Sequence, residues 1–205
     1  MNKEHISFNI YRVGIVFSSI CMALMLLVLG GSNEAHAHGS ASKPIMLKVD
    51  GVGRMHPDTV QSSVNPRLSV PAMCFTVDLL DMSTGGVIGT ATDCLSEMVP
   101  NVGDSGFLAI ATTTFTTPEG SATVQGAVAV QPLQNSALFL SDTGQEYTHM
   151  SGAIGSGNAI IASTGAFSGL RGTSRLSGLL NMGLFTTAEG DPVLFNCLFE
   201  LHLFN

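Results

Sequence analysis

The sequence predicts an all-β protein, folded as a sandwich or a closed barrel, and three observations support this prediction. Short runs rich in Thr, Val, Ala and Phe recur at intervals of about ten residues, as expected for strands on a sheet surface. Clusters of Gly, Pro, Asn, Asp and Ser separate these runs and are typical of turns. After the apolar run at the N-terminus, no segment shows a convincing helical period. Many short strands joined by tight turns favour a sandwich or a barrel.

Residues 1–37 have the pattern of a cleavable signal peptide. Lys3 and Arg12 precede a long apolar run, and the small residues of Ala35-His36-Ala37 then mark a cleavage point. We therefore expect a secreted or periplasmic protein with no stable membrane span after processing. The alternative is an uncleaved anchor, because the run from residue 13 to residue 29 approaches the length that crosses a bilayer.

Charge and composition narrow the function classes. The net charge is −7 and no run of basic residues occurs, so we do not expect nucleic-acid binding. The chain has no Trp and few charged residues, whereas small residues and Val dominate. This composition is typical of a β-rich exported protein.

The chain after the signal segment contains three cysteines, Cys74, Cys94 and Cys197. An odd number in an oxidising compartment predicts one disulfide and one free thiol. Cys74 and Cys94 flank a turn almost symmetrically, which favours that pair. Cys197 near the C-terminus is the alternative partner for either, and the sequence leaves the connectivity open.

The first part of the exported chain, residues 38–71, predicts an irregular leader. Prolines and turn residues interrupt it repeatedly, so we expect only one short strand there, at residues 45–49. The regular strands begin near residue 72.

Residues 72–205 predict three pairs of strands and one last strand. The first pair surrounds Ser83-Thr84-Gly85-Gly86, the second surrounds Pro118-Glu119-Gly120, and the third surrounds the glycines between residues 165 and 172. The arms of these pairs and the last strand are residues 73–82 and 87–95, 107–117 and 121–131, 159–163 and 173–182, and 193–204.

Several of these segments resemble those of one known family. The hairpin VDLLDMSTGGVIGTATDC, the segment FTTPEGSATVQGAVAV, the stretch STGAFSGLRGTSRLSG and the last strand FNCLFELHL are similar, in this order, to segments of the allene oxide cyclase barrel family and its relatives, the plant dirigent proteins. The chain departs from the family pattern at two positions. Ser163 stands where the family usually has a glycine, and Leu170 stands where the family has an alanine before the arginine and glycine that match Arg171 and Gly172. The resemblance covers residues 72–205.

The resemblance implies a small closed antiparallel β-barrel of about eight strands. It also implies a homotrimer and an apolar cavity that binds or shapes a hydrophobic small molecule. In the last strand, the odd-numbered residues from Val193 to Leu203 are all apolar, whereas the opposite face is half apolar. An apolar outer face would suit contact with a partner subunit.

Asn196, Glu200 and His202 are the best polar cluster, because their even spacing along a strand places them on one face. If this face lines the cavity, Glu200 and His202 would act as acid and base. The alternative is that the face meets solvent.

Arg171 is the residue that the family resemblance supports most. Inside an apolar barrel it would stabilise an oxyanion or enolate, and the alternative is a structural arginine that holds its turn. Asp78 and Asp93 lie on predicted strands of the first hairpin and are weaker candidates for inward-facing carboxylates.

His38 would become the N-terminal residue after cleavage, and an N-terminal histidine can form a copper brace with a second histidine. No evident second histidine accompanies it, so copper binding is the least favoured function. The chain also lacks a Cys-x-x-Cys pair, a His-Glu-x-x-His motif, a P-loop lysine and a Gly-x-Ser-x-Gly elbow, and we expect no cofactor.

Two function hypotheses remain besides copper binding. The first is an exported barrel that binds a hydrophobic small molecule and acts as a cyclase, an isomerase or a dirigent-like stereochemical guide. The second is a barrel with a non-catalytic binding role or a structural role. A cavity lined by polar groups of perturbed pKa would favour the enzyme, and a barrel filled by side chains would favour the structural role.

Overall fold

The computed structural model describes residues 44–100, 106–132, 147–153, 158–181 and 189–204. These residues form ten β-strands and a single turn of 3₁₀-helix, η2 (Gly165–Phe167), and none of them forms an α-helix. The strands are β1 (Ile45–Arg54), β2 (His56–Gln61), β3 (Ser69–Leu80), β4 (Val87–Pro100), β5 (Phe107–Thr117), β6 (Gly120–Pro132), β7 (Tyr147–Ala153), β8 (Ile160–Ser163), β9 (Arg171–Asn181) and β10 (Pro192–Phe204). The predicted all-β class is therefore confirmed.

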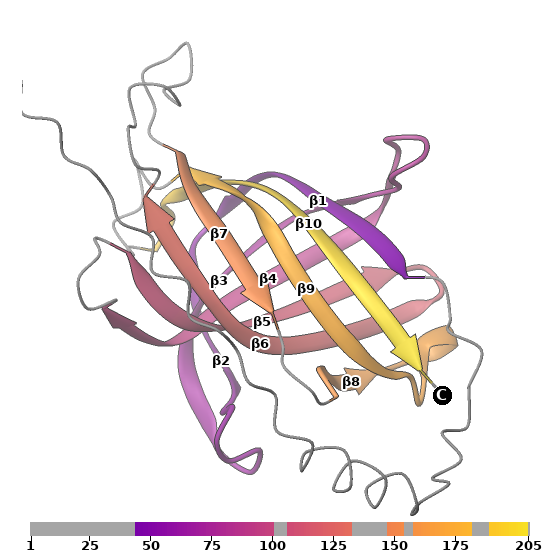
Figure 1. Ribbon diagram of the computed structural model, residues 1–205, viewed down its shortest axis with the longest axis horizontal. Helices are drawn as coiled ribbons and strands as arrows, with labels where there is room; N and C mark the ends of the chain where they lie inside the picture. Colours follow the sequence, from indigo (N-terminus) through magenta and orange to yellow (C-terminus); the bar gives the residue numbers. More distant parts are fainter. Residues whose placement is uncertain (1–43, 101–105, 133–146, 154–157, 182–188, 205) are drawn as a thin grey trace, which may run out of the picture. The chain divides into compact units, whose positions relative to one another are not determined.

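Eight of the strands close into an antiparallel barrel. They follow the order β1, β10, β9, β7, β6, β5, β4 and β3, and β3 pairs with β1 through Leu79 opposite Val49 to complete the ring. Figure 1 shows these strands crossing the barrel obliquely around a shared interior. Closure pairs the backbone groups that an open sheet would expose at its edges. This confirms the predicted closed barrel of about eight strands.

Two short strands extend this ring. β2 continues along β3 from His56 opposite Cys74 to Gln61 opposite Ser69. β8 pairs with β6, so the prediction that residues 159–163 pair mainly with residues 173–182 is wrong. A backbone hydrogen bond of 2.7 Å from Ala159 to Gly172 still joins the two segments.

The predicted irregular leader contains two of the strands, and this part of the prediction is corrected. β1 is a full member of the barrel, since all ten of its residues from Ile45 to Arg54 pair with β10. The glycines of this segment weaken its strand pattern in the sequence. Gly53 is nevertheless required by the packing, because a Cβ there would lie 2.9 Å from the Cβ of Phe75. Pro57 is tolerated because β2 pairs with β3 alone, and an edge strand can lack a backbone donor.

The core fills the barrel with alternate residues of each strand. On β10 the odd-numbered residues from Val193 to Leu201 are buried, and the residues between them are partly or fully exposed. Two aromatic pairs cross the interior edge to face, Phe75 with Phe195 at 5.0 Å between ring centroids and Phe115 with Phe199 at 4.9 Å. Such pairs add about 0.5–1.5 kcal/mol beyond the burial of their apolar area.

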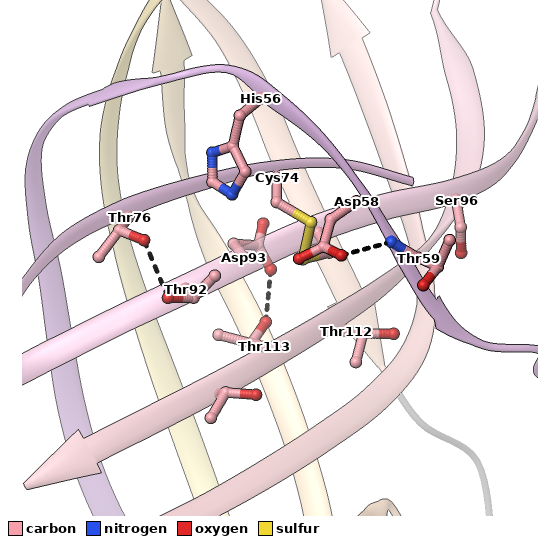
Figure 2. The surroundings of a disulfide bond; sticks show 12 residues. His56, Asp58, Thr59, Cys74, Thr76, Thr92, Asp93, Ser96, Thr112 and Thr113 are labelled. Carbon is pink, nitrogen blue, oxygen red and sulfur yellow. Dashed lines mark hydrogen bonds between the residues drawn. A yellow bond between two sulfur atoms is a disulfide. The ribbon is translucent and has the colours of Figure 1, made fainter. Parts of the chain in front are cut away.

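The disulfide joins Cys74 and Cys94, directly opposite residues of β3 and β4. This confirms the favoured pairing and leaves Cys197 as a buried free thiol. The bond lies on the sheet face opposite to the barrel interior, where it contacts Ala72 and Val60 in a small second apolar cluster. Figure 2 shows the Cys74 side chain beneath His56.

Residues 1–37 and His38 lie outside the described residues, so the signal peptide stays a prediction. Among the described residues, no helix has the length and apolar character that crossing a membrane requires.

Candidate functional site

An apolar cavity of about 50 Å³ lies at the end of the barrel where β10 finishes. Strand residues form its walls, among them Leu47, Leu79, Phe115, Ile160 and Leu201. Thr117 contributes the sole polar side chain of the lining. We call this cavity the end pocket. Its chemistry suits a hydrocarbon group, which gains about 25 cal/mol for each Å² of apolar area that leaves water.

A cap formed by residues 163–170 covers the end pocket. Phe167 and Leu170 line the pocket from this segment, and both side chains are only half-buried. None of the residues of η2 is buried. The cap therefore has little packing of its own, which is typical of segments that open at low cost.

Hydrogen bonds tie the cap to the turn between β5 and β6. Ala166 N donates to Glu119 O at 2.9 Å, and Ser121 N donates to the Thr164 hydroxyl at 3.1 Å. The backbones approach so closely that a Cβ on Gly165 would overlap the Glu119 carbonyl. Glycine is thus required at position 165 by contact with the neighbouring turn, as well as by the positive φ of 59°.

A second, smaller cavity of about 20 Å³ is lined by residues of β5, β6, β7, β9 and β10, and we call it the inner cavity. It also reaches the outer surface, since exposed Ala127 is part of its lining. Phe199 lines the inner cavity and Phe115 lines the end pocket, so the edge-to-face pair of these rings separates the two. Thr113 and Ser174 supply hydroxyl groups to the inner wall, which is otherwise apolar or glycine. A cavity of this size holds about one water molecule.

Asp93 is a fully buried carboxyl group that contacts Thr113, a residue of the inner-cavity lining. It lies on β4 directly opposite Thr113 of β5, and the Thr113 hydroxyl donates a hydrogen bond of 2.5 Å to Asp93 Oδ1. Figure 2 shows this bond between the two strands. The other oxygen, Oδ2, is buried and has no hydrogen-bond partner among the described residues.

Burial raises the pKa of Asp93 from 3.8 to about 6, and the hydrogen bond from Thr113 offsets part of this rise. The cause is desolvation, which penalises the charged form of an acid. Below pH 6 the group is therefore a neutral acid with a proton to donate. Asp93 was one of two weakly favoured carboxylates, and the prediction that it faces inward is confirmed, whereas Asp78 is exposed.

Cys197 is the other titratable side chain that faces the barrel interior among the described residues. Burial raises the pKa of its thiol, and the negative charge of Asp93 raises it further. The thiolate, which is the nucleophilic form, is therefore strongly disfavoured. Cys197 acts as a small apolar core residue here.

The predicted catalytic cluster on β10 lies outside the barrel. Asn196 is exposed, and the side chains of Glu200 and His202 are 31% and 43% exposed. His202 Nε2 and Glu200 Oε1 are 2.8 Å apart, so the structure does bring this pair together. The premise that this face lines the cavity is wrong, because the apolar face of the strand occupies the interior.

Arg171 is also exposed, at the start of β9. Its guanidinium carbon lies 6.0 Å from the centre of the Phe204 ring, a distance compatible with a cation–π contact. Leu170, the preceding residue, lines the end pocket, but Arg171 itself does not. The catalytic role of Arg171, Asn196, Glu200 and His202 stays a prediction.

One group of possible metal ligands occurs among the described residues. His56, Asp58 and Cys74 place one ligand atom each within 4.8 Å of one another. The Cys74 sulfur belongs to the disulfide and offers no thiolate, so the donor set does not fit a metal site. The proposed copper ligand His38 lies outside the described residues.

No family model matches the chain, and no curated protein matches it. Among solved structures it is similar to a nonspecific heme-binding cyclase that catalyses a cycloaddition in neoabyssomicin biosynthesis, with 14% identity over 91% of this chain and 80% of that chain and a TM-score of 0.35. It is also similar to the Diels-Alderase AbmU from Streptomyces koyangensis, with 13% identity over 76% of this chain and 63% of that chain and a TM-score of 0.31. Similarity at this level assigns neither a family nor an activity.

Proposed function

We propose that the protein binds a hydrophobic small molecule inside the barrel, with the end pocket as the binding site. The observation that carries the proposal is the apolar pocket itself, whose lining contains one hydroxyl group and no charge. Pockets of this kind bind mainly by removing apolar area from water.

The size of the end pocket determines how a ligand must enter. Sites for drug-sized ligands span about 300–1,000 Å³, whereas the end pocket measures about 50 Å³. A complete ligand therefore has to displace Phe167 and Leu170 from the mouth. Residues 164–170 of the cap lie outside the strands, so they can move without breaking a strand pairing, at the cost of their hydrogen bonds to Glu119 and Ser121.

A test of binding uses cyclohexane as the probe and a filled pocket as the perturbation. Ala122 lines the end pocket and is 7% exposed, so Ala122→Leu places a branched side chain in the cavity. Ala162→Leu, on the exposed face of β8, is the matched control. In a methyl NMR titration, cyclohexane should bind wild type and Ala162→Leu alike and bind Ala122→Leu at least tenfold more weakly. Absence of saturable binding to wild type would leave the structural role as the better account.

A cyclase or isomerase activity is the second candidate, and one observation favours it. Asp93 is a neutral acid at mildly acidic pH and lies two residues along β4 from Ala91, which is opposite the pocket residue Phe115. An acid close to an apolar site can donate a proton to a substrate that the walls hold in one reactive conformation. Ala122→Leu would then abolish turnover together with binding, whereas Asp93→Asn would remove turnover and keep binding.

Export of the protein, its homotrimeric state and its relation to allene oxide cyclases and dirigent proteins belong to the same proposal. The disulfide between Cys74 and Cys94 supports export, since such bonds persist in oxidising compartments.

A further inference from the structure

The unpartnered oxygen of Asp93 is the feature of the barrel that apolar binding does not explain. The side chain is 0% exposed, and its Oδ2 atom has no hydrogen-bond partner among the described residues. A buried polar atom without a partner costs about 1–3 kcal/mol. A core position with this cost is often a site where a ligand supplies the missing partner.

The surroundings of Asp93 favour a neutral acid over a carboxylate. Its strand neighbours facing inward are Phe75 on β3 and Thr113 on β5, and Thr113 already binds Oδ1. Across the barrel, β10 presents the Cys197 thiol. The lysine and arginine residues of the described segments lie on the outer face or in turns, so none of them compensates a charge here. A neutral carboxyl group has one hydrogen to donate from the oxygen that lacks a partner.

Asp93 is also close to the route from the end pocket. Thr113 lines the inner cavity, and Phe115, two residues further along β5, lines the end pocket. The contacting rings of Phe115 and Phe199 therefore lie between the end pocket and the Thr113 hydroxyl, which is hydrogen-bonded to Asp93. For a ligand in the end pocket to reach Asp93, one of these rings has to turn aside.

We propose that the ligand of the barrel carries a neutral oxygen acceptor, such as a ketone or ester carbonyl, to which Asp93 donates a hydrogen bond from Oδ2 while the hydrocarbon part fills the end pocket. This inference rests on the proposed function and adds the chemical class of the ligand. A carboxylate ligand is disfavoured, because no inward-facing lysine or arginine among the described residues offsets the cost of burying its charge. An amine ligand would instead require ionised Asp93, and the test separates these cases.

The test compares three probes with one carbon skeleton, cyclohexanone, cyclohexane and cyclohexylamine. The affinity of each probe is first corrected for its partition between water and an alkane. After this correction, wild-type protein at pH 5 should bind cyclohexanone at least about fivefold more tightly than cyclohexane. A factor of about five is what one net hydrogen bond supplies. This preference should fall as the pH rises above 6 and Asp93 ionises. The carbonyl stretch of bound cyclohexanone should move to lower frequency at pH 5.

Two variants locate the effect. Asp93→Leu removes the donor while keeping an apolar side chain of similar size, so it should bind cyclohexane as wild type does and lose the preference for cyclohexanone. Thr113→Val keeps the acid and should retain the preference. Replacing a buried ionisable group by an apolar one of similar volume is often neutral or stabilising, so the Leu variant is expected to fold.

The outcomes separate the inference from the proposed function. If cyclohexane and cyclohexanone bind equally, or if Asp93→Leu keeps the preference, the inference is wrong and apolar binding stands; a water molecule then satisfies Oδ2. If cyclohexylamine binds most tightly above pH 6, the ligand is a cation and the inference is wrong. If none of the three probes binds, the proposed function itself fails.

Discussion

Replacing Asp93 by Asn should remove a specific pH dependence of stability. The pKa of Asp93 is raised from 3.8 to about 6 in the folded barrel. Because the folded state holds the proton more tightly, the stabilisation is complete below the unfolded pKa and is lost as the pH rises through the folded pKa. A shift of about two units corresponds to about 3 kcal/mol, at about 1.4 kcal/mol for each unit.

The assay is urea unfolding of wild type and Asp93→Asn at several values between pH 3.5 and pH 7.5, an interval chosen to span the change. Relative to the variant, the unfolding free energy of wild type should fall by about 3 kcal/mol between pH 4 and pH 6 and then stay level. Asp78→Asn, an exposed position on the neighbouring strand, is the matched control and should follow wild type.

Other carboxyl groups have a lowered pKa and change the unfolding free energy with pH in the opposite direction. They are present in both proteins, so their contributions cancel in the difference between wild type and Asp93→Asn. Hydrogen bonds from the Ser83 hydroxyl, followed by those from Thr84, lower the pKa of Asp81 to about 2, and a hydrogen bond from the Ser63 hydroxyl lowers the pKa of Glu97. Both groups stabilise the fold above their unfolded pKa and lose that effect as the pH falls. Parallel curves for wild type and Asp93→Asn would show that Asp93 titrates normally and would refute the burial argument.

Three further predictions concern the cysteines and a glycine. Cys74→Ala combined with Cys94→Ala should lower the unfolding free energy by about 3 kcal/mol, since the disulfide closes a loop with a sequence separation of 20, and an unchanged urea midpoint would contradict this. Cys197 should resist alkylation in native protein and react after unfolding, as followed by peptide mass spectrometry; rapid native labelling would contradict its burial. Gly178→Ala should cost about 1–3 kcal/mol in thermal unfolding, because its Cβ would overlap the Cys197 sulfur and the β10 backbone, and wild-type stability would contradict this packing.

The sequence predicted the barrel because its strands carry strong local signals. The last strand has a wholly apolar face, and the structure places that face inside. β1 was underestimated because Gly51 and Gly53 weaken its strand pattern, although Gly51 adopts a positive φ and Gly53 makes room for Phe75. β7 was missed because its residues other than Tyr147 and Met150 are polar or small, and pairing with β6 and β9 decides its conformation.

The site was harder to predict than the fold. Asn196, Glu200 and His202 share one face, but the sequence did not show that this face points outward. The signal for Asp93 was present, because it alternates with Thr92 and Cys94 and shares its face with Ala91 and Leu95, which are apolar. The missing partner of its Oδ2 atom depends on how the strands meet in space, and no spacing in the sequence reveals it.

The central claim, that an apolar molecule occupies the end pocket, is tested most directly by nuclear Overhauser effects between bound cyclohexane and protein methyl groups. The account predicts contacts with Leu170 and Leu201, which line the pocket, and none with Leu179, which is exposed on the outer face of β9. Contacts confined to Leu179 and other outer-face methyl groups would contradict the account.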